Sequence, residues 1–386
     1  MKNNKLLILL PIFFGYFVMG FVDIVGISTN NVMHDFKLSN TLADLLPMFV
    51  FFWFLVLSVP VGLMMNKIGR KNSVIISMVI TTLALLIPSI HYSFSITLLA
   101  FALLGIGNAI LQVALNPLVT NVVSSERIPS SFTLGQFIKA IASFTGPIIA
   151  AFAANHFGNW KLIFPAYALV SIISAIWLAS APIEREKSVS KTISFGKCFG
   201  LLKNSYILML FLGILLVVLI DVGLNTYVPQ YLKFRCGLTT QKAGFGSSLY
   251  FLAKTIGAFA GTFILMKVSI KLVFRISVSI AILAFAVMLF LSGLWSILTT
   301  IFIVGFSCAN IFSMIFSLAI QKLPEKANEI SGLMMMGVSG GALVLLMGFL
   351  TDKFGLMSGM LVLMVCLLYL LFFSLTIKKK SEISNA

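Results

Sequence analysis

The chain has 386 residues, of which 60% are apolar and 10% are charged, and its formal net charge is +16. A soluble domain carries about 25% charged residues and an outer-membrane barrel alternates apolar with polar residues, so this composition excludes both classes. Nucleic-acid binding is excluded as well, because the lysines and arginines fall in short clusters between apolar runs and form no single patch.

Twelve apolar runs are long enough to cross a bilayer as helices, which takes about 20 residues each. They lie at residues 6–29, 42–65, 72–91, 94–122, 130–155, 160–183, 206–232, 241–266, 272–292, 294–321, 328–351 and 356–377. The first run is longer than a secretory signal and lacks a convincing cleavage site, so we interpret it as a retained helix. We therefore predict an all-α polytopic membrane protein with twelve transmembrane helices.

The basic residues between these spans favour one orientation. Most of the 27 lysines and arginines lie in segments that share a side with the two termini, and few lie in the alternate loops. Positive residues are enriched on the cytoplasmic side of a membrane. This distribution predicts a multi-pass protein of the cell inner membrane with both termini in the cytoplasm.

The first span carries an aspartate where hydrocarbon is expected. Asp23 lies in the run GFVDIVGIST, and Tyr16 and Asn30 stand seven residues before and after it, on the same helix face. A charge at mid-bilayer costs about 2.5–3.5 kcal/mol on insertion scales, so such a residue is expected to face a cavity or a partner. We predict that Asp23 takes part in proton coupling and that Tyr16 and Asn30 contact substrate.

The loop after the second span has a specific pattern. The segment GLMMNKIGRK, residues 62–71, resembles the signature loop of the major facilitator superfamily, in which a glycine precedes an acidic residue by four positions and Gly-Arg-Lys follows. The matching residues are Gly62, Gly69, Arg70 and Lys71, while Asn66 stands at the acidic position. The resemblance implies a cytoplasmic gate in which Gly62 admits another helix and the charges latch the two halves. The alternative is a basic turn that only sets the topology.

Spans four and five carry a closer resemblance. The segments GIGNAILQVALNPLVTNVV (105–123) and SSFTLGQFIKAIASFTGP (130–147) resemble the fucose/galactose/glucose:proton symporter family. That resemblance implies proton-driven sugar uptake, with a buried carboxylate on span one, matched by Asp23, and another on span four, where Gln112 stands instead. A family asparagine on span five falls at Lys139. Amide side chains both donate and accept, which suits hydroxylated solutes, and we predict substrate contacts from Gln112, Asn116 and Gln136.

The longest polar stretch divides the twelve spans into six and six. It has the sequence IEREKSVSKTISFGKCFGLLKNS, residues 183–205. We predict an N-terminal six-helix bundle over residues 1–183, a cytoplasmic linker with a short amphipathic helix over residues 184–205, and a C-terminal bundle with a short basic tail over residues 206–386.

The second half repeats features of the first. Gly213 lies eight residues before Asp221, as Gly15 lies eight residues before Asp23. Two further pairs recur at a similar offset, namely Gly62 with Gly261 and Gly105 with Gly305. Duplicated halves with a site at their interface are the design of many secondary transporters, so we predict two pseudosymmetric bundles in the major facilitator fold. On polar faces of spans seven and ten we predict substrate contacts from Asn225 and Asn310; the alternative for every such amide is a bond to a neighbouring helix.

Four charged residues inside the predicted spans are assigned to proton coupling: Asp23, Lys139, Asp221 and Lys254. In the superfamily architecture spans one and seven line the cavity and spans five and eight flank it, so the resemblance places Asp23 near Lys139 and Asp221 near Lys254. Burial and a nearby ammonium shift the pKa of a carboxylate in opposite directions. A contact between Asp23 and Lys139 that breaks and re-forms would load and release a proton, whereas a permanent pair would leave transport uncoupled.

Together these features predict a secondary active transporter that imports a small polar solute, a sugar, by alternating access, with proton coupling through Asp23. The alternatives are a carrier of an acidic sugar or organic anion held by Lys139 and Lys254, an uncoupled facilitator, and a non-transporting membrane sensor. No Ser/His/Asp set, metal cluster or phosphate loop is visible, so we predict neither an enzyme nor a metal or cofactor. The resemblance implies a monomer whose partners are the solute, protons and the lipid bilayer.

Overall fold

The structure, a computed structural model, describes residues 2–123, 128–183, 195–323 and 326–376. Twelve helical spans in these residues are long and apolar enough to cross a bilayer, which confirms the predicted number. The described residues contain no strand. Each span is helical because a helix satisfies all its backbone hydrogen bonds internally, where the bilayer offers none.

Some of the first six spans consist of more than one helical element. In chain order their elements are α1 (Lys2–Met19), η1 (Gly20–Ile24), α2 (Val25–Asp35), α3 (Asn40–Ala43), α4 (Leu45–Ile68), α5 (Arg70–Ile90), α6 (Phe94–Val122), α7 (Ile128–Phe157), η3 (Trp160–Leu162) and α8 (Ile163–Ser180). The segment η1 is a single 3-10 stretch inside span one, and it holds Asp23. Such a stretch in the middle of a helix often marks a functional hinge.

A short helix in the linker leads into the second half. The linker helix α9 (Phe195–Gly200) and the turn η4 (Leu201–Lys203) agree with the predicted short helix, while residues 184–194 lie outside the described residues. The last six spans contain α10 (Ser205–Cys236), α11 (Thr240–Lys267), α12 (Ile270–Phe290), α13 (Leu294–Cys308), α14 (Ile311–Lys322), α15 (Ala327–Met336), η6 (Gly337–Leu343), α16 (Val344–Phe354) and α17 (Leu356–Thr376).

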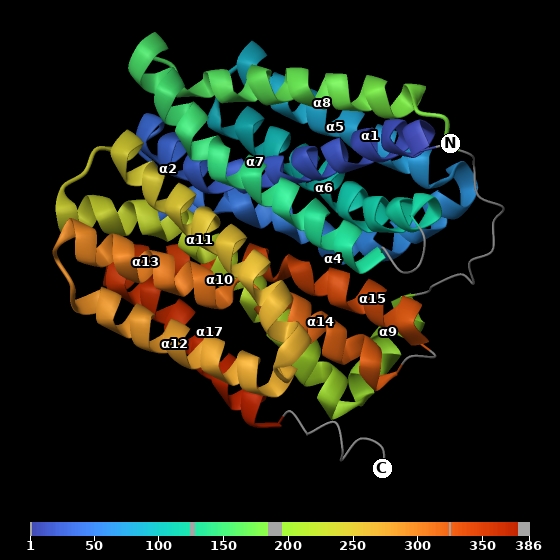
Figure 1. The fold of residues 1–386 in the computed structure, drawn as a ribbon. Helices are drawn as coiled ribbons and strands as arrows, with labels where there is room; N and C mark the ends of the chain where they lie inside the picture. The colour runs from blue at the N-terminus through green and yellow to red at the C-terminus, as the bar shows by residue number, and fades with distance from the viewer. Residues whose placement is uncertain (1, 124–127, 184–194, 324–325, 377–386) are drawn as a thin grey trace.

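The two sets of six spans form two bundles side by side. Figure 1 shows α1 to α8 on one side of the molecule and α10 to α17 on the other. The bundles meet where α7 packs on α11, α4 on η6, and α2 on α10. Asn30 on α2, Lys139 on α7, Asp221 and Asn225 on α10, and Lys254 on α11 therefore lie on helices that do meet there.

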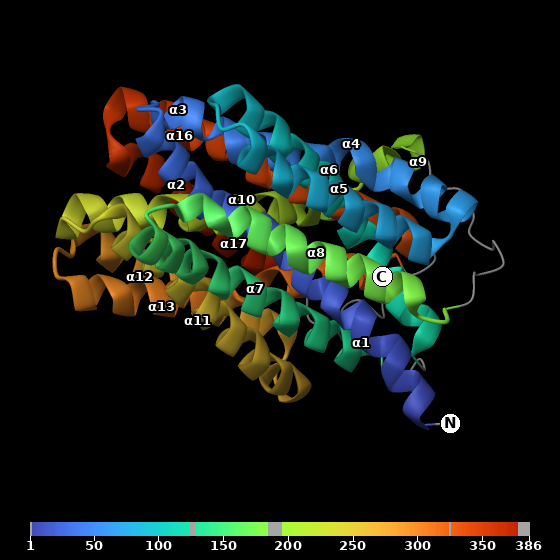
Figure 2. The same cartoon turned by 90° about the horizontal axis from the view of Figure 1, so that it is seen from above.

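The two ends of the molecule differ in how closely the bundles approach. We call the end that holds the start of α1, the α4–α5 turn and α9 the terminal end, and the end that holds α3 and the α16–α17 turn the loop end. At the loop end α3 and α16 lie together, whereas α7 and α11 diverge toward the terminal end (Figures 1 and 2). The molecule is thus closed at its loop end.

Candidate functional site

The buried aspartate of the second half is held by an ion pair. Lys254 Nζ lies 2.7 Å from Asp221 Oδ2, and Tyr250 OH donates to Asp221 Oδ1 at 2.5 Å. Tyr250 and Lys254 stand one turn apart on α11, so one helix supplies both donors to a carboxylate on α10. The predicted proximity of Asp221 and Lys254 is confirmed.

The aspartate of the first half has a different partner. Ser143 Oγ on α7 donates to Asp23 Oδ2 at 2.5 Å, and the same Oγ lies 3.1 Å from the carbonyl oxygen of Lys139. From the other half, Asn225 Nδ2 donates to the backbone carbonyl of Asp23 at 2.8 Å. Asp23 therefore sits where η1, α7 and α10 meet.

The expected contact between the carboxylate of Asp23 and the ammonium of Lys139 is not formed in this conformation. The backbone of Lys139 does lie against η1, because a Cβ added at Gly20 would come within 2.5 Å of the Lys139 carbonyl oxygen. Among the described residues, however, no carboxylate pairs with the Lys139 side chain. The hydroxyl of Ser143, one turn further along α7, occupies the place at Asp23 that the ammonium was expected to fill.

Two of the amides predicted to contact substrate, Asn116 and Asn310, instead join helices of the same bundle. Tyr16, which is fully buried, donates from its OH to Asn116 Oδ1 at 2.6 Å, and this bond ties α1 to α6. Gln112 Nε2 donates to Asn108 Oδ1 at 2.7 Å, and Asn310 Nδ2 donates to the carbonyl of Gly257 at 2.8 Å. The bonds of Asn116 and Asn310 match the alternative role of helix-to-helix bonding in this conformation, whereas the bond of Gln112 stays within α6.

The remaining predicted substrate residues fall in two places. The side chain of Gln136 is exposed on α7. Asn30 and Asn225 are buried between α2 and α10, where Asn30 Nδ2 donates to the carbonyl of Thr226 at 2.9 Å. Asn225 and Asn30 are thus brought close to Asp23 along one contact between the two bundles.

The basic loop after span two stabilises its own bundle. Gly69 has φ +88°, which only glycine adopts without strain, and it ends α4 and begins α5. Arg70 Nη1 donates to the carbonyl of Pro117 at 2.9 Å, and Lys71 Nζ donates to the carbonyls of Ala179 and Ala181 at 2.9 and 2.7 Å. These described bonds reach α6 and the end of α8, not the other half.

The gating role of this loop therefore stays a prediction. The described bonds of Arg70 and Lys71 do not latch the halves, and no atom lies within 4 Å of a Cβ added at Gly62, so no helix packs closely there. Elsewhere along α4 the second half does pack against this helix, through η6 and α15. The side chain of Asn66 lies outside the described residues.

The strongest contacts between the bundles lie at the loop end, and none of them was predicted. The carboxylate of Asp352 on α16 accepts four hydrogen bonds of 2.6–2.9 Å from the amides and side chains of Asn40 and Thr41 at the start of α3. Asp44, fully buried just after α3, accepts a bond of 2.6 Å from the OH of Tyr227 on α10. We call the contacts of α2, α3 and Asp44 with α10 and α16 the loop-end seam.

For Asp44, one residue of this seam, the sequence did contain a signal. Asp44 lies within the predicted span 42–65, so the rule that selected Asp23 also applied to it. Its position at the edge of that span made it resemble an ordinary interfacial residue. Asp352 offered no such signal, because its partners are more than three hundred residues away in the chain.

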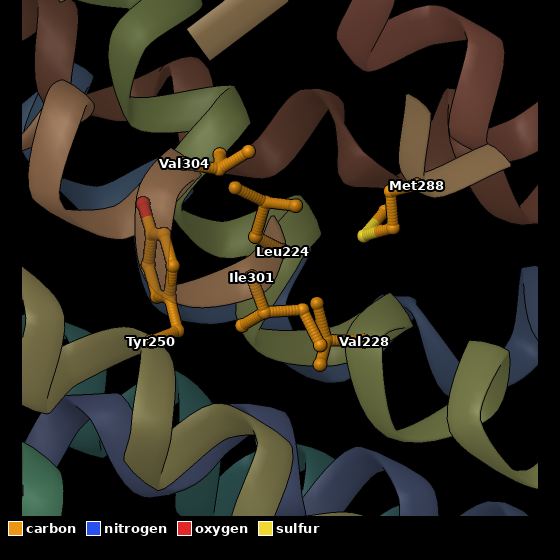
Figure 3. A pocket seen from close by; sticks show the side chains of 6 residues that line it. All are labelled: Leu224, Val228, Tyr250, Met288, Ile301 and Val304. Atoms are coloured by element: carbon orange, nitrogen blue, oxygen red, sulfur yellow. The ribbon is translucent and has the colours of Figure 1, made fainter. Parts of the chain in front are cut away.

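A small gap in the second bundle is not a solute site. It lies among α10, α11, α12 and α13, beside the ring of Tyr250, and is too narrow for a water molecule (Figure 3). Its lining consists of Leu224, Val228, Tyr250, Met288, Ile301 and Val304. The only hydrogen-bonding group in this apolar lining is the Tyr250 hydroxyl, and this hydroxyl already donates to Asp221.

Gly348 has no side chain, so α16 can approach Asp44 and α3 closely in the loop-end seam. A large residue at this position therefore tests whether the seam is closed. A Cβ added at Gly348 would come within 2.7 Å of Asp44 Oδ2 and 2.9 Å of the Asn40 carbonyl oxygen. We expect Gly348→Trp to hold the loop end open and to raise the thiol reactivity of an Asn225→Cys probe, at a buried position against Gly26 of α2, at least about tenfold. The measurement is the rate of maleimide labelling of the purified protein in a background without its four native cysteines.

The neighbouring residue provides the matched control for this variant. Phe349 is 47% exposed and directed away from the seam, so Phe349→Trp adds the same ring without entering the contact. Equal labelling rates in the two variants would contradict the closure of the seam at Gly348.

Known proteins share this architecture. Residues 12–345 match the family described as the Major Facilitator Superfamily. The glucose/galactose transporter of Brucella abortus is 23% identical over 384 residues, which cover 93% of this chain and 91% of that protein. The structure of the nucleoside transporter NupG has a TM-score of 0.78 at 14% identity, covering 97% of this chain and 98% of that one. The E. coli fucose:proton symporter FucP has a TM-score of 0.69 at 18% identity, covering 98% and 99%.

The sequence match and the fold lead to the same assignment. The matched region extends over most of the twelve spans, and the two bundles pack as in the solved transporters. This chain therefore belongs to the Major Facilitator Superfamily of membrane transporters.

Proposed function

We propose that this transporter imports a small neutral sugar by alternating access, with proton coupling through Asp23. The observation that carries the proposal is the balance of charge around the interface of the bundles. The ammonium of Lys254 lies 2.7 Å from the carboxylate of Asp221 and neutralises its charge. The negative charge of Asp23 and the positive charge of Lys139 also add up to zero. A site without net charge suits a neutral solute, and its amides and hydroxyls suit one with hydroxyl groups.

The relatives support the same class of solute. The Brucella protein is named a glucose/galactose transporter, and FucP is described as a fucose:proton symporter. Both names refer to neutral sugars. The resemblance of spans four and five to that symporter family points in the same direction, although Gln112 and Lys139 replace two of its polar residues.

The contacts of Asp23 supply a physical route for coupling. Its carboxylate faces Ser143 in its own bundle, while its backbone carbonyl accepts a bond from Asn225 in the other bundle. Opening the loop end separates α10 from α2, and this movement breaks the second bond and changes the surroundings of Asp23. A group whose surroundings differ between two conformations binds protons with different affinity in each, and this difference is what coupling requires.

The arrangement of basic residues assigns a direction to the two ends. The terminal end carries the linker and most of the lysines and arginines, so we assign it to the cytoplasm. The loop-end seam would then close the outer side of the transporter. Alternating access would be a rocking of the units 1–183 and 206–386 about Asp23 and Asp221, with residues 184–205 as the linker between them.

A second candidate is a carrier of acidic sugars or organic anions. The observation in its favour is that Lys139 has no carboxylate partner among the described residues and lies beside η1. An ammonium in that position can accept the carboxylate of a solute as its counter-ion. In that case Lys139 is a ligand rather than part of the coupling machinery.

Thermal unfolding of the purified protein with a panel of sugars separates these candidates. A ligand present at about 100 times its dissociation constant stabilises the folded state by roughly 2.7 kcal/mol, so it raises the unfolding temperature measurably. We expect a rise with glucose, galactose or fucose, and its loss in Gln112→Ala. Gln321→Ala, at the exposed end of α14, is the control and should keep the rise.

The other outcomes decide against the proposal. A rise only with hexuronates or sialic acid, abolished by Lys139→Ala, would establish the anion carrier. No rise with any sugar, neutral or acidic, would remove the support for sugar transport and leave only the family assignment.

A further inference from the structure

The loop-end seam buries polar atoms without partners. Among the described residues, the buried atoms that lack a hydrogen bond include Asn30 Oδ1 on α2, Asn225 Oδ1 and Thr226 Oγ1 on α10, and Asp44 Oδ1. Each such atom costs about 1–3 kcal/mol when it is sealed from water, and water would satisfy it in an opened seam. The closed seam is therefore only narrowly favoured, and a modest change at one residue can open it.

Among the described residues, Asp44 is the carboxylate that is sealed completely within this seam. Its side chain has no exposed surface, its Oδ2 accepts from Tyr227 OH at 2.6 Å, and Gly348 of α16 covers it. No lysine, arginine or histidine pairs with Asp44 among the described residues. An ionised carboxylate buried without a cation is costly, and a proton on Oδ1 would remove that charge.

The other titratable groups around Asp44 are Tyr227 and Asp352. Asp352 is exposed at the rim of the seam and accepts four hydrogen bonds from Asn40 and Thr41, which suit its ionised form. A negative charge on Asp44 would oppose that of Asp352, since both carboxylates lie at the contact between α16 and α3. Loss of the charge on Asp44 therefore also favours closure of the seam.

We propose that Asp44 is a second proton-binding site, distinct from Asp23, and that its proton holds the loop end closed. When α16 withdraws from α3, water reaches the carboxylate and the proton leaves. Because the closed form binds this proton more tightly, low pH favours the closed seam and rising pH opens it. The inference does not require that Asp23 couples solute to protons, because it concerns only the equilibrium of the gate.

The distance across the seam as a function of pH tests the proposal. Spin labels at Leu42→Cys on α3 and Phe354→Cys at the end of α16, both exposed, report whether these helices are together in the full-length protein. One linked proton changes the ratio of open to closed molecules by up to about tenfold per pH unit. We expect that ratio to rise between pH 5 and pH 9 in the parent protein and in Asp23→Asn, and to stay low and constant when Asp44→Asn is added to Asp23→Asn.

Two matched carboxylate variants identify the group that titrates. Asp352→Asn weakens the rim of the seam, so it should raise the open fraction at every pH and keep the dependence on pH. Asp23→Asn removes any contribution of Asp23 to the same equilibrium and should keep the dependence that Asp44 produces, which separates a failure of this inference from a failure of proton-coupled transport. A parent protein without pH dependence, or an Asp44→Asn variant that titrates like the parent, would overturn the proposal.

Tyr227→Phe provides a second route if Asp44→Asn does not fold. The variant removes the described donor to Asp44 Oδ2, so the ionised carboxylate loses stabilisation and the midpoint of opening should move to higher pH. Tyr231→Phe is the control, because Tyr231 lies one turn along α10 and donates to the Met288 carbonyl within its own bundle. An unmoved midpoint in Tyr227→Phe would contradict the assignment to Asp44.

Discussion

Asp23→Asn is expected to abolish uphill accumulation of solute in proteoliposomes while downhill exchange continues. Asparagine retains an oxygen that can accept the bond from Ser143 and leaves the backbone bond to Asn225 in place, but it cannot carry a proton. With one proton per solute and a driving force of 100 mV, about 2.3 kcal/mol is available, which corresponds to roughly 50-fold accumulation. In Asp23→Asn the accumulation ratio should fall to about 1.

A second carboxylate on the same span is the control for this result. Asp35 at the end of α2 accepts bonds from Tyr92 and Trp160 and takes no part in the contact between the bundles. Asp35→Asn should therefore accumulate solute as the parent does. Normal accumulation by Asp23→Asn would show that protons are coupled elsewhere, and a parent protein that does not accumulate solute would show that transport is not coupled.

Lys254→Met is expected to cause the largest loss of stability among single substitutions at the interface. It leaves the carboxylate of Asp221 without its cation, and removing one partner of a buried pair costs 3–5 kcal/mol. The pair here keeps about a fifth of its side-chain surface exposed, with 21% for Lys254 and 24% for Asp221, so we expect about 3 kcal/mol. The measurement is thermal unfolding in detergent at neutral pH.

The double variant shows whether the lost charge is the cause. In Lys254→Met with Asp221→Asn no unpaired charge remains, so most of the lost stability should return. Lys242→Met, at the exposed start of the same helix, should change little. A double variant no more stable than Lys254→Met would assign the loss to packing of the lysine stem rather than to the ion pair.

The class of the protein and its twelve spans were predictable because they depend on local properties. A run of about 20 apolar residues forms a helix in a bilayer whatever its neighbours are. The cost of a buried charge is local as well, which is why Asp23, Asp221, Lys139 and Lys254 could be selected from the sequence. The pairing of Asp221 with Lys254 followed from the helices expected to be neighbours, and the structure contains it.

It was less predictable which side chains of two neighbouring helices bond to each other. Lys139 and Ser143 stand one turn apart on α7, and a small rotation of that helix decides which of them faces Asp23. Spacing along the chain does not determine that rotation, because it results from packing against several helices at once. The same limit applies to Tyr16 and Asn116, which share a bond rather than a solute.

The sequence by itself determined that this protein is a two-bundle membrane transporter, since hydropathy, the basic loop and the buried charges are properties of single segments. Only the tertiary structure decided which end is closed and by which residues. Asp352 meets Asn40 and Thr41, and Asp44 meets Tyr227, across bundles that are separated by most of the chain. Such contacts depend on the relative position of two rigid bundles, which changes during transport, and no property of a single helix encodes it.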